Sequence, residues 1–202
     1  DAGWHIELDS AGLRKVLVNQ DYYASVAANA RNEADKVYLS DCLRDASWLV
    51  KSLDQRARTV LKVASEIVRQ QDAFLARGIQ FLRPLNLKMV ADAISMHEST
   101  VSRVTSNKFM ATPRGTFELK FFFTSAIAAA DGGDAHSAAA VRHRIKELID
   151  QESPKAILSD DRIVQILNDD GIDIARRTVA KYREAMKIAS SVQRRREKSA
   201  MQ

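Results

Sequence analysis

The longest run of helical periodicity in the sequence lies between Leu39 and Phe74. Apolar residues recur there at alternating spacings of four and three, which places them on one face of an α-helix. A single helix over this range would be about 55 Å long, more than a compact domain of this size needs, so we interpret it as a strut. The series consists of Leu39, Leu43, Ala46, Val50, Leu53, Ala57, Val60, Ala64, Ile67, Gln71 and Phe74, and only Gln71 is polar.

The limits of this helix are less well defined than its centre. No glycine or proline occurs from Leu13 to Arg77, so helix is predicted throughout that stretch. A two-helix hairpin broken near residues 52–55, or a coiled-coil seam, stays open as an alternative. Gly78, directly after Arg77, is expected to end the helix as a left-handed cap, and Pro84 prevents its continuation.

A second pattern, from Leu87 to Asn107, fits two short helices joined by a tight turn. The small Ala91 lies where the two helices must approach closely, and Ser95 occupies a turn position where glycine causes less strain. An amphipathic hairpin without DNA-binding function has the same period. The outer face of the second helix favours a DNA groove, because it is small and hydrogen-bonding. Val90, Ile94, Met96, Val101 and Val104 face inward, and Glu98, Ser99, Thr100, Ser102, Arg103 and Ser106 face outward, with Lys108 just beyond.

Aromatic residues gather after this motif. A turn is predicted at residues 112–115, and four of the seven phenylalanines of the chain fall within residues 117–123. Such rings can stack on unpaired bases, but we expect them to pack against the strut or the helix-turn-helix. Residues 125–140 are small and include Gly132 and Gly133, which is typical of a hinge.

Three further helices are predicted after the hinge, over residues 138–151, 160–169 and 174–186. The last two form a helix-turn-helix with a turn that is longer than usual. In the final helix Val179, Tyr182 and Met186 would face inward, while Arg177 and Lys181 project together from the exposed face. A basic helix is usually only a solvated surface, but an arginine fork can also bind a guanine edge or a phosphate. Asp160 and Asp161 are predicted to cap the start of the helix over residues 160–169.

Charge and composition narrow the class of protein. The 202 residues carry a formal net charge of +5, and residues 171–202 hold nine Lys and Arg against three Asp and Glu, so a polyanion would bind at that end. The single cysteine, Cys42, suits a reducing compartment. The four histidines form no metal-binding pattern, and no phosphate loop or nucleophile elbow is present, so neither an enzyme nor a cofactor is predicted.

Three stretches resemble one known family. The segment Ala175 to Glu184, which reads ARRTVAKYRE, resembles the RpoN box, the signature of the sigma-54 family of bacterial promoter-recognition subunits. Residues 48–63, WLVKSLDQRARTVLKV, resemble the extra-long helix of that family. Residues 112–123, TPRGTFELKFFF, resemble the stretch that follows its first helix-turn-helix. The chain also begins without methionine, and we expect it to be part of a longer protein.

The resemblance implies a sigma factor that directs core RNA polymerase to double-stranded promoter DNA with a GG element near −24 and a GC element near −12. An AAA+ activator ATPase, contacting an N-terminal region outside this sequence, would trigger opening. A helix-turn-helix repressor that acts without polymerase is the alternative, and a helical adaptor would need no DNA. We expect a cytoplasmic, nucleoid-associated protein without membrane partners.

The predicted fold is all-α, with an extra-long helix and helix-turn-helix in residues 1–124, a hinge at 125–140 and a three-helix C-terminal domain at 141–202. The resemblance assigns the −24 element to the box and the −12 element to the first helix-turn-helix. The basic C-terminal end is expected to be a mobile tail that contacts phosphates, or simply a solvated segment. The predicted DNA-binding residues are Arg176, Arg177, Lys181, Arg183, Glu98, Ser99, Ser102, Arg103, Lys108, Arg194, Arg195 and Arg196.

Overall fold

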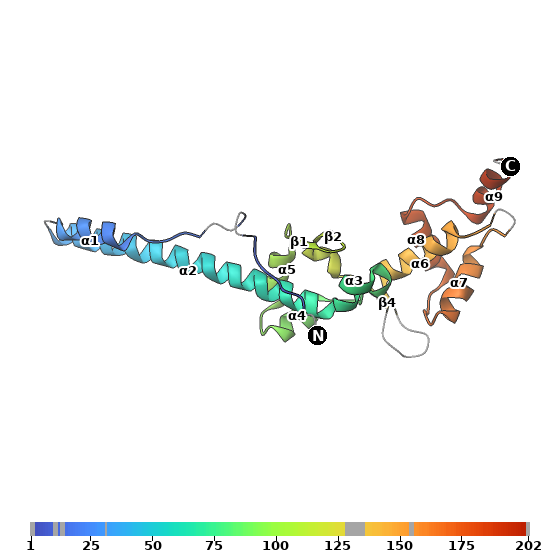
Figure 1. Ribbon diagram of the computed structural model, residues 1–202, viewed down its shortest axis with the longest axis horizontal. Helices are drawn as coiled ribbons and strands as arrows, with labels where there is room; N and C mark the ends of the chain where they lie inside the picture. The colour runs from blue at the N-terminus through green and yellow to red at the C-terminus, as the bar shows by residue number, and fades with distance from the viewer. Residues whose placement is uncertain are drawn as a thin grey trace. The chain divides into compact units, whose positions relative to one another are not determined.

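The computed structural model describes residues 3–9, 12, 15–30, 32–127, 136–153 and 156–200 (Figure 1). The chain divides into two units, residues 1–65 and 66–202, and the boundary lies within the longest helix. Among the described residues, no helix is both long enough and apolar enough to span a bilayer. The prediction of an all-α fold is confirmed, since helices dominate the described residues and the strands there form only two short ribbons.

The first unit contains helix α1 (Gln20–Ala28) and most of helix α2 (Glu33–Gln70). The expectation of uninterrupted helix from Leu13 onward is wrong, because asparagine side chains bind the backbone at the break. The Asn29 amide donates to the Ser25 carbonyl at 2.9 Å. The Asn32 side chain accepts from the Asp35 amide at 2.7 Å, which caps the start of α2.

Helix α2 runs without a break through residues 52–55, so the long helix is confirmed and the hairpin alternative is wrong. It ends at Gln70, seven residues before the predicted end at Arg77, and helix α3 (Asp72–Arg77) follows. Gln71, at this junction, is fully buried. Its amide donates to the Arg83 carbonyl at 2.8 Å and its oxygen accepts from the Arg83 amide at 3.0 Å. The one polar member of the helical series therefore pairs with both backbone groups of Arg83.

Helix α3 ends at Gly78, but not as the predicted left-handed cap. Its φ of +110° and ψ of −173° belong to a region that is open almost only to glycine. The short 3-10 helix η1 (Ile79–Phe81) follows directly.

The first helix-turn-helix consists of α4 (Leu87–Ala93) and α5 (Glu98–Thr105). Val90, Ala91 and Val101 are buried between the elements, as the spacing predicted. Ser95 has a φ of +54°, which confirms the strained turn position. Asn86 caps α4 and His97 caps α5, each by accepting a backbone N–H bond.

A β-hairpin that the sequence did not predict follows α5. Strands β1 (Phe109–Thr112) and β2 (Gly115–Glu118) pair antiparallel, with Phe109 opposite Glu118, and the 3-10 helix η2 (Leu119–Phe122) comes next. The rings of Phe117, Phe121 and Phe122 contact one another and Phe74 of α3. The expectation of internal packing is therefore confirmed for Phe117, Phe121 and Phe122.

Part of the predicted hinge is regular structure. Strands β3 (Ala126–Ile127) and β4 (His136–Ser137) form an antiparallel ribbon, and residues 138–140 already belong to helix α6 (Ala138–Asp150). The rest of that prediction, residues 128–135, lies outside the described residues.

The C-terminal helices share one core. Helices α6, α7 (Asp160–Asp169) and α8 (Arg176–Ala185) match the three predicted helices to within two residues at each end. Helix α9 (Ser191–Ala200) was not predicted as helix, and the expectation of a mobile tail there is wrong. The buried core residues of these elements are Val141, Ile145, Ile149, Ile163, Leu167, Ile172, Ile174 and Val179.

Candidate nucleic-acid interface

Helix α8 packs its inner face against this core, and several of its basic residues lie on the exposed face. Val179 is fully buried, and Tyr182 and Met186 pack against the same cluster, as predicted. Arg177 and Lys181 are exposed and four residues apart, so they lie on one face of α8. Within the described residues neither has a carboxylate partner. Their charges are therefore available to a polyanion.

The turn before α8 depends on Gly171. Helix α7 ends with hydrogen bonds from the Gly171 amide to the Asn168 carbonyl at 2.9 Å and from the Ile172 amide to the Leu167 carbonyl at 2.8 Å. Gly171 has a φ of +83°, the left-handed conformation that glycine adopts at low cost. This turn returns Ile172 and Ile174 to the core and sets where α8 begins.

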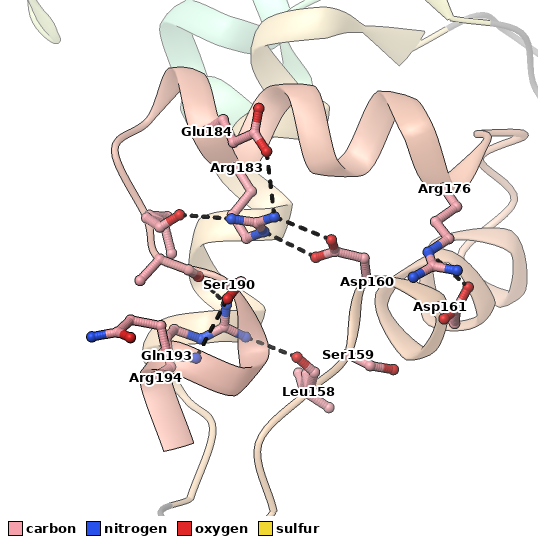
Figure 2. A network of polar contacts seen from close by, with 12 residues as sticks. Leu158, Ser159, Asp160, Asp161, Arg176, Arg183, Glu184, Ser190, Gln193 and Arg194 are labelled. Atoms are coloured by element: carbon pink, nitrogen blue, oxygen red, sulfur yellow. Dashed lines mark hydrogen bonds and ion pairs between the residues drawn. The ribbon is translucent and has the colours of Figure 1, made fainter. Parts of the chain in front are cut away.

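Arg183 faces the protein interior, so its prediction as a DNA-binding residue is corrected. Its Nε and Nη2 donate to the two carboxylate oxygens of Asp160 at 3.0 and 3.2 Å, and its Nη1 donates to the Ile188 carbonyl at 2.9 Å (Figure 2). The side chain is 7% exposed. Arg183 thus anchors the end of α8 to the start of α7.

Arg176, the first residue of α8, takes a different position. Its Nε lies 3.3 Å from a carboxylate oxygen of Asp161, and the two side chains are 68% and 59% exposed (Figure 2). Such an open pair contributes little to the stability of the fold. The terminal nitrogens of Arg176 have no partner among the described residues, so the arginine can still donate to a ligand.

Arg194 is also withdrawn from the surface, and its prediction as a phosphate contact is corrected. Its Nε and Nη2 donate to the two carboxylate oxygens of Glu152 at 2.8 and 3.0 Å. Nη2 also donates to the Leu158 carbonyl (Figure 2). The Lys198 ammonium lies 3.3 Å from the same carboxylate. Arg195 and Arg196, in contrast, are exposed on α9.

The buried carboxylate of Glu152 is kept ionised by these donors. Burial alone would raise the pKa of Glu152, but the hydrogen bonds from Arg194, the Leu158 amide and Lys198 outweigh it and leave the pKa below its ordinary value.

Helix α5 presents a smaller polar face. Ser102 and Arg103 are exposed on the side opposite the buried Val101. Ser99 is exposed too, and its hydroxyl lies 2.8 Å from Nδ1 of His97. Glu98 is exposed in the first turn, and Lys108, beyond the helix, is half-buried. The predicted residues of this helix therefore share one accessible region, as a groove-binding helix requires.

Comparison with known proteins decides the family. Residues 36–196 match the family model described as Sigma-54, DNA binding domain. This chain belongs to the sigma-54 family. It is 68% identical over 200 residues to RNA polymerase sigma-54 factor 2 of Bradyrhizobium diazoefficiens, a match that covers 99% of this chain and 37% of that protein. It is also 68% identical over 201 residues to the RNA polymerase sigma-54 factor of Azorhizobium caulinodans, with 100% of this chain and 39% of that protein covered.

A solved structure shows the same likeness. Aquifex aeolicus sigmaN bound to promoter DNA has a TM-score of 0.60 and 34% identity to this chain, over 95% of this chain and 56% of that one. The chain thus spans about two fifths of the length of these sigma-54 relatives. Membership of this family does not favour a repressor that acts without polymerase.

Some contacts in and around the candidate site were not predicted from the sequence. Asp160 and Asp161 are predicted only to cap a helix, yet each contacts an arginine of the box. Arg114, in the hairpin turn, donates to the Leu75 carbonyl at 3.1 Å and to the Ala76 carbonyl, which ties the hairpin to α3. The only sequence signal for the contacts of Asp160 and Asp161 with these arginines is the presence of two adjacent acids at the start of the helix before the box.

Among the described residues, no three His, Cys, Asp or Glu side chains are placed to hold a metal ion.

Proposed function

We propose that this chain is the DNA-reading part of a sigma-54-type initiation factor and binds promoter DNA sequence-specifically, without enzymatic activity. The observation that carries the proposal is the exposed pair Arg177 and Lys181 on α8, within a signature typical of the family and above a fully buried Val179. A helix held rigidly by its inner face can position an arginine fork accurately enough to distinguish a guanine from other bases.

The two helix-turn-helix modules have separate roles in this proposal. Helix α8 reads the −24 GG element through Arg176, Arg177 and Lys181. Helix α5 reads the −12 GC element, where Ser99, Ser102 and Arg103 are small or forked donors suited to base edges and phosphates. Glu98 and Lys108 border that helix, and Glu98 can accept a hydrogen bond from a cytosine amino group. Arg195 and Arg196 on α9 contact phosphates.

The remaining partners belong to the whole protein. We propose that the full-length factor directs core RNA polymerase to −24/−12 promoters and that an AAA+ activator ATPase is needed for opening. The names of the relatives, which are RNA polymerase sigma-54 factors, support the first part. The promoter-bound state of Aquifex sigmaN supports direct recognition of DNA. A nucleoid-associated, cytoplasmic location is consistent with such partners.

A direct binding titration tests the proposal. Fluorescence anisotropy with a duplex that carries both elements, and with a scrambled duplex of equal length and composition, gives both affinities at one salt concentration. We expect the promoter duplex to bind at least about 100-fold more tightly than the scrambled duplex. This threshold is modest, because specific DNA-binding proteins usually show larger ratios. Equal affinities would contradict the proposal, and size-exclusion chromatography that gave a dimer would favour the repressor alternative.

A further inference from the structure

The first two residues of α7 hold two different arginines of the box helix. Asp160 binds Arg183 through both carboxylate oxygens, and these side chains are only 16% and 7% exposed. Asp161 binds Arg176 through a single contact, and both groups lie in solvent (Figure 2). The first pair anchors the helix. The second pair is too exposed to contribute much to folding, so any role of Asp161 would lie in how it orients Arg176.

The geometry of the second pair leaves Arg176 able to bind DNA. The contact uses Nε, on the side of the guanidinium nearest the chain. The two terminal nitrogens are the donors that bind O6 and N7 of guanine in a bidentate pair. A carboxylate 3.3 Å from Nε favours guanidinium orientations that leave the terminal nitrogens free, and such preorganisation reduces the entropy lost on binding.

Asp161 also acts on the phosphates. Its negative charge lies at the start of α7, where the helix dipole would otherwise attract an anion. It also lies 3.3 Å from Arg176 and offsets part of that positive charge. Together these effects weaken the sequence-independent attraction of this corner of the protein for a DNA backbone.

We propose that Asp161 is a positioning residue for DNA recognition: it holds Arg176 toward a guanine edge and restrains it from binding phosphates indiscriminately. This inference rests on the proposed function, because it assumes that α8 enters a DNA groove. Asp161 itself contacts no base in this account. It sets the ratio between promoter binding and binding to any other sequence.

The test compares Asp161→Asn with Asp169→Asn, which removes the same charge from an exposed residue at the other end of α7. Both variants are titrated against the promoter duplex and the scrambled duplex over a range of salt concentrations. For Asp161→Asn we expect affinity for the scrambled duplex to rise several-fold, with a salt slope steeper by about one, because Arg176 becomes a free phosphate contact. Affinity for the promoter duplex should rise less, so that the specificity ratio falls by about threefold or more. Asp169→Asn should leave the ratio unchanged.

A double-variant cycle separates this mechanism from a general charge effect. In an Arg176→Ala background, Asp161→Asn should leave the specificity ratio unchanged, because the residue through which it acts is gone. An equal rise on both duplexes, or the same fall in ratio without Arg176, would overturn the inference while leaving promoter recognition intact. Wild-type protein that bound both duplexes equally would overturn the proposed function and this inference with it.

Discussion

The carboxylate of Glu152 and the guanidinium of Arg194 form a two-point pair at 2.8 and 3.0 Å between residues that are 42 positions apart. The Glu152 side chain is fully buried and that of Arg194 is 7% exposed. The pair joins the chain after α6 to helix α9, and the Leu158 carbonyl accepts a further bond from the same guanidinium. Arg194 therefore belongs to the structure of the C-terminal domain, although it begins a run of three arginines.

Replacing Arg194 should lower stability. We expect Arg194→Ala to reduce the free energy of unfolding by about 3–5 kcal/mol, because it leaves a buried carboxylate without its main partner. Urea denaturation monitored by circular dichroism measures this. Arg195→Ala is the matched control, since that side chain is exposed; it should change stability little and reduce the salt slope of DNA binding by about one. Equal stability of the two variants would contradict the role of the pair.

The same carboxylate predicts a pH dependence. Since the pKa of Glu152 is lowered in the folded state, its contribution is complete above the pKa of the unfolded chain, about 4.3. That contribution is lost as pH falls through the lower folded value. The difference in Tm between wild type and Glu152→Gln should therefore be largest near neutral pH and shrink below about pH 4. Asp173→Asn, an exposed change, is the control. A difference that stayed constant down to pH 3 would refute this linkage.

The helices were predictable because their signals are local. The four-and-three spacing identified α2, and buried positions such as Val90, Val101 and Val179 follow from periodicity alone. The break between α1 and α2 was not predicted, because neither glycine nor proline marks it. Asparagine side chains form hydrogen bonds with the backbone there, and these bonds compete with the helix. The hairpin was not predicted, because its strands have only four residues each and an alternating pattern of that length is too short to recognise.

The candidate site was only partly predictable, for a different reason. Arg177 and Arg183 belong to the same basic helix, but Arg177 is exposed and Arg183 binds Asp160, 23 residues earlier. Helical periodicity places Arg183 four residues after the buried Val179, on the inner face, but it does not identify the carboxylate that Arg183 meets there. Arg194 and Arg195 are adjacent, yet Arg194 is buried and Arg195 is exposed. The carboxylate partner of a buried arginine depends on tertiary structure, which the pattern of a single segment does not reveal.

Gln71 provides a test of the junction between α2 and α3. We expect Gln71→Leu to lower the free energy of unfolding by about 2–4 kcal/mol, because the Arg83 amide and carbonyl would both lose their buried partner. Thermal and chemical denaturation measure the loss. Gln70→Leu, on the neighbouring and more exposed residue, should cost clearly less. If Gln71→Leu were as stable as wild type, the amide pairing would have no energetic role.

The two-module proposal predicts how the spacing of the elements affects binding. The elements near −24 and −12 lie about one helical turn apart, so both modules would meet one face of the DNA. Inserting about five base pairs rotates one element to the far side and should reduce affinity to that of a single element. A full-turn insertion of about ten base pairs should restore part of it. Gel-shift titration of the three duplexes measures this, and equal affinities for all three would rule out two reading modules.

The most direct measurement is the discrimination of Arg177→Ala between promoter and scrambled DNA. The fold should be retained, because Arg177 is exposed and within the described residues no hydrogen bond or ion pair holds it. If α8 reads a guanine through this fork, affinity for the promoter duplex should fall by about 1–3 kcal/mol, while affinity for the scrambled duplex falls much less. A duplex with a substitution at the contacted guanine should then bind wild type and variant alike. Equal losses on promoter and scrambled DNA would mean that Arg177 contacts only phosphate, and would contradict sequence reading by this helix.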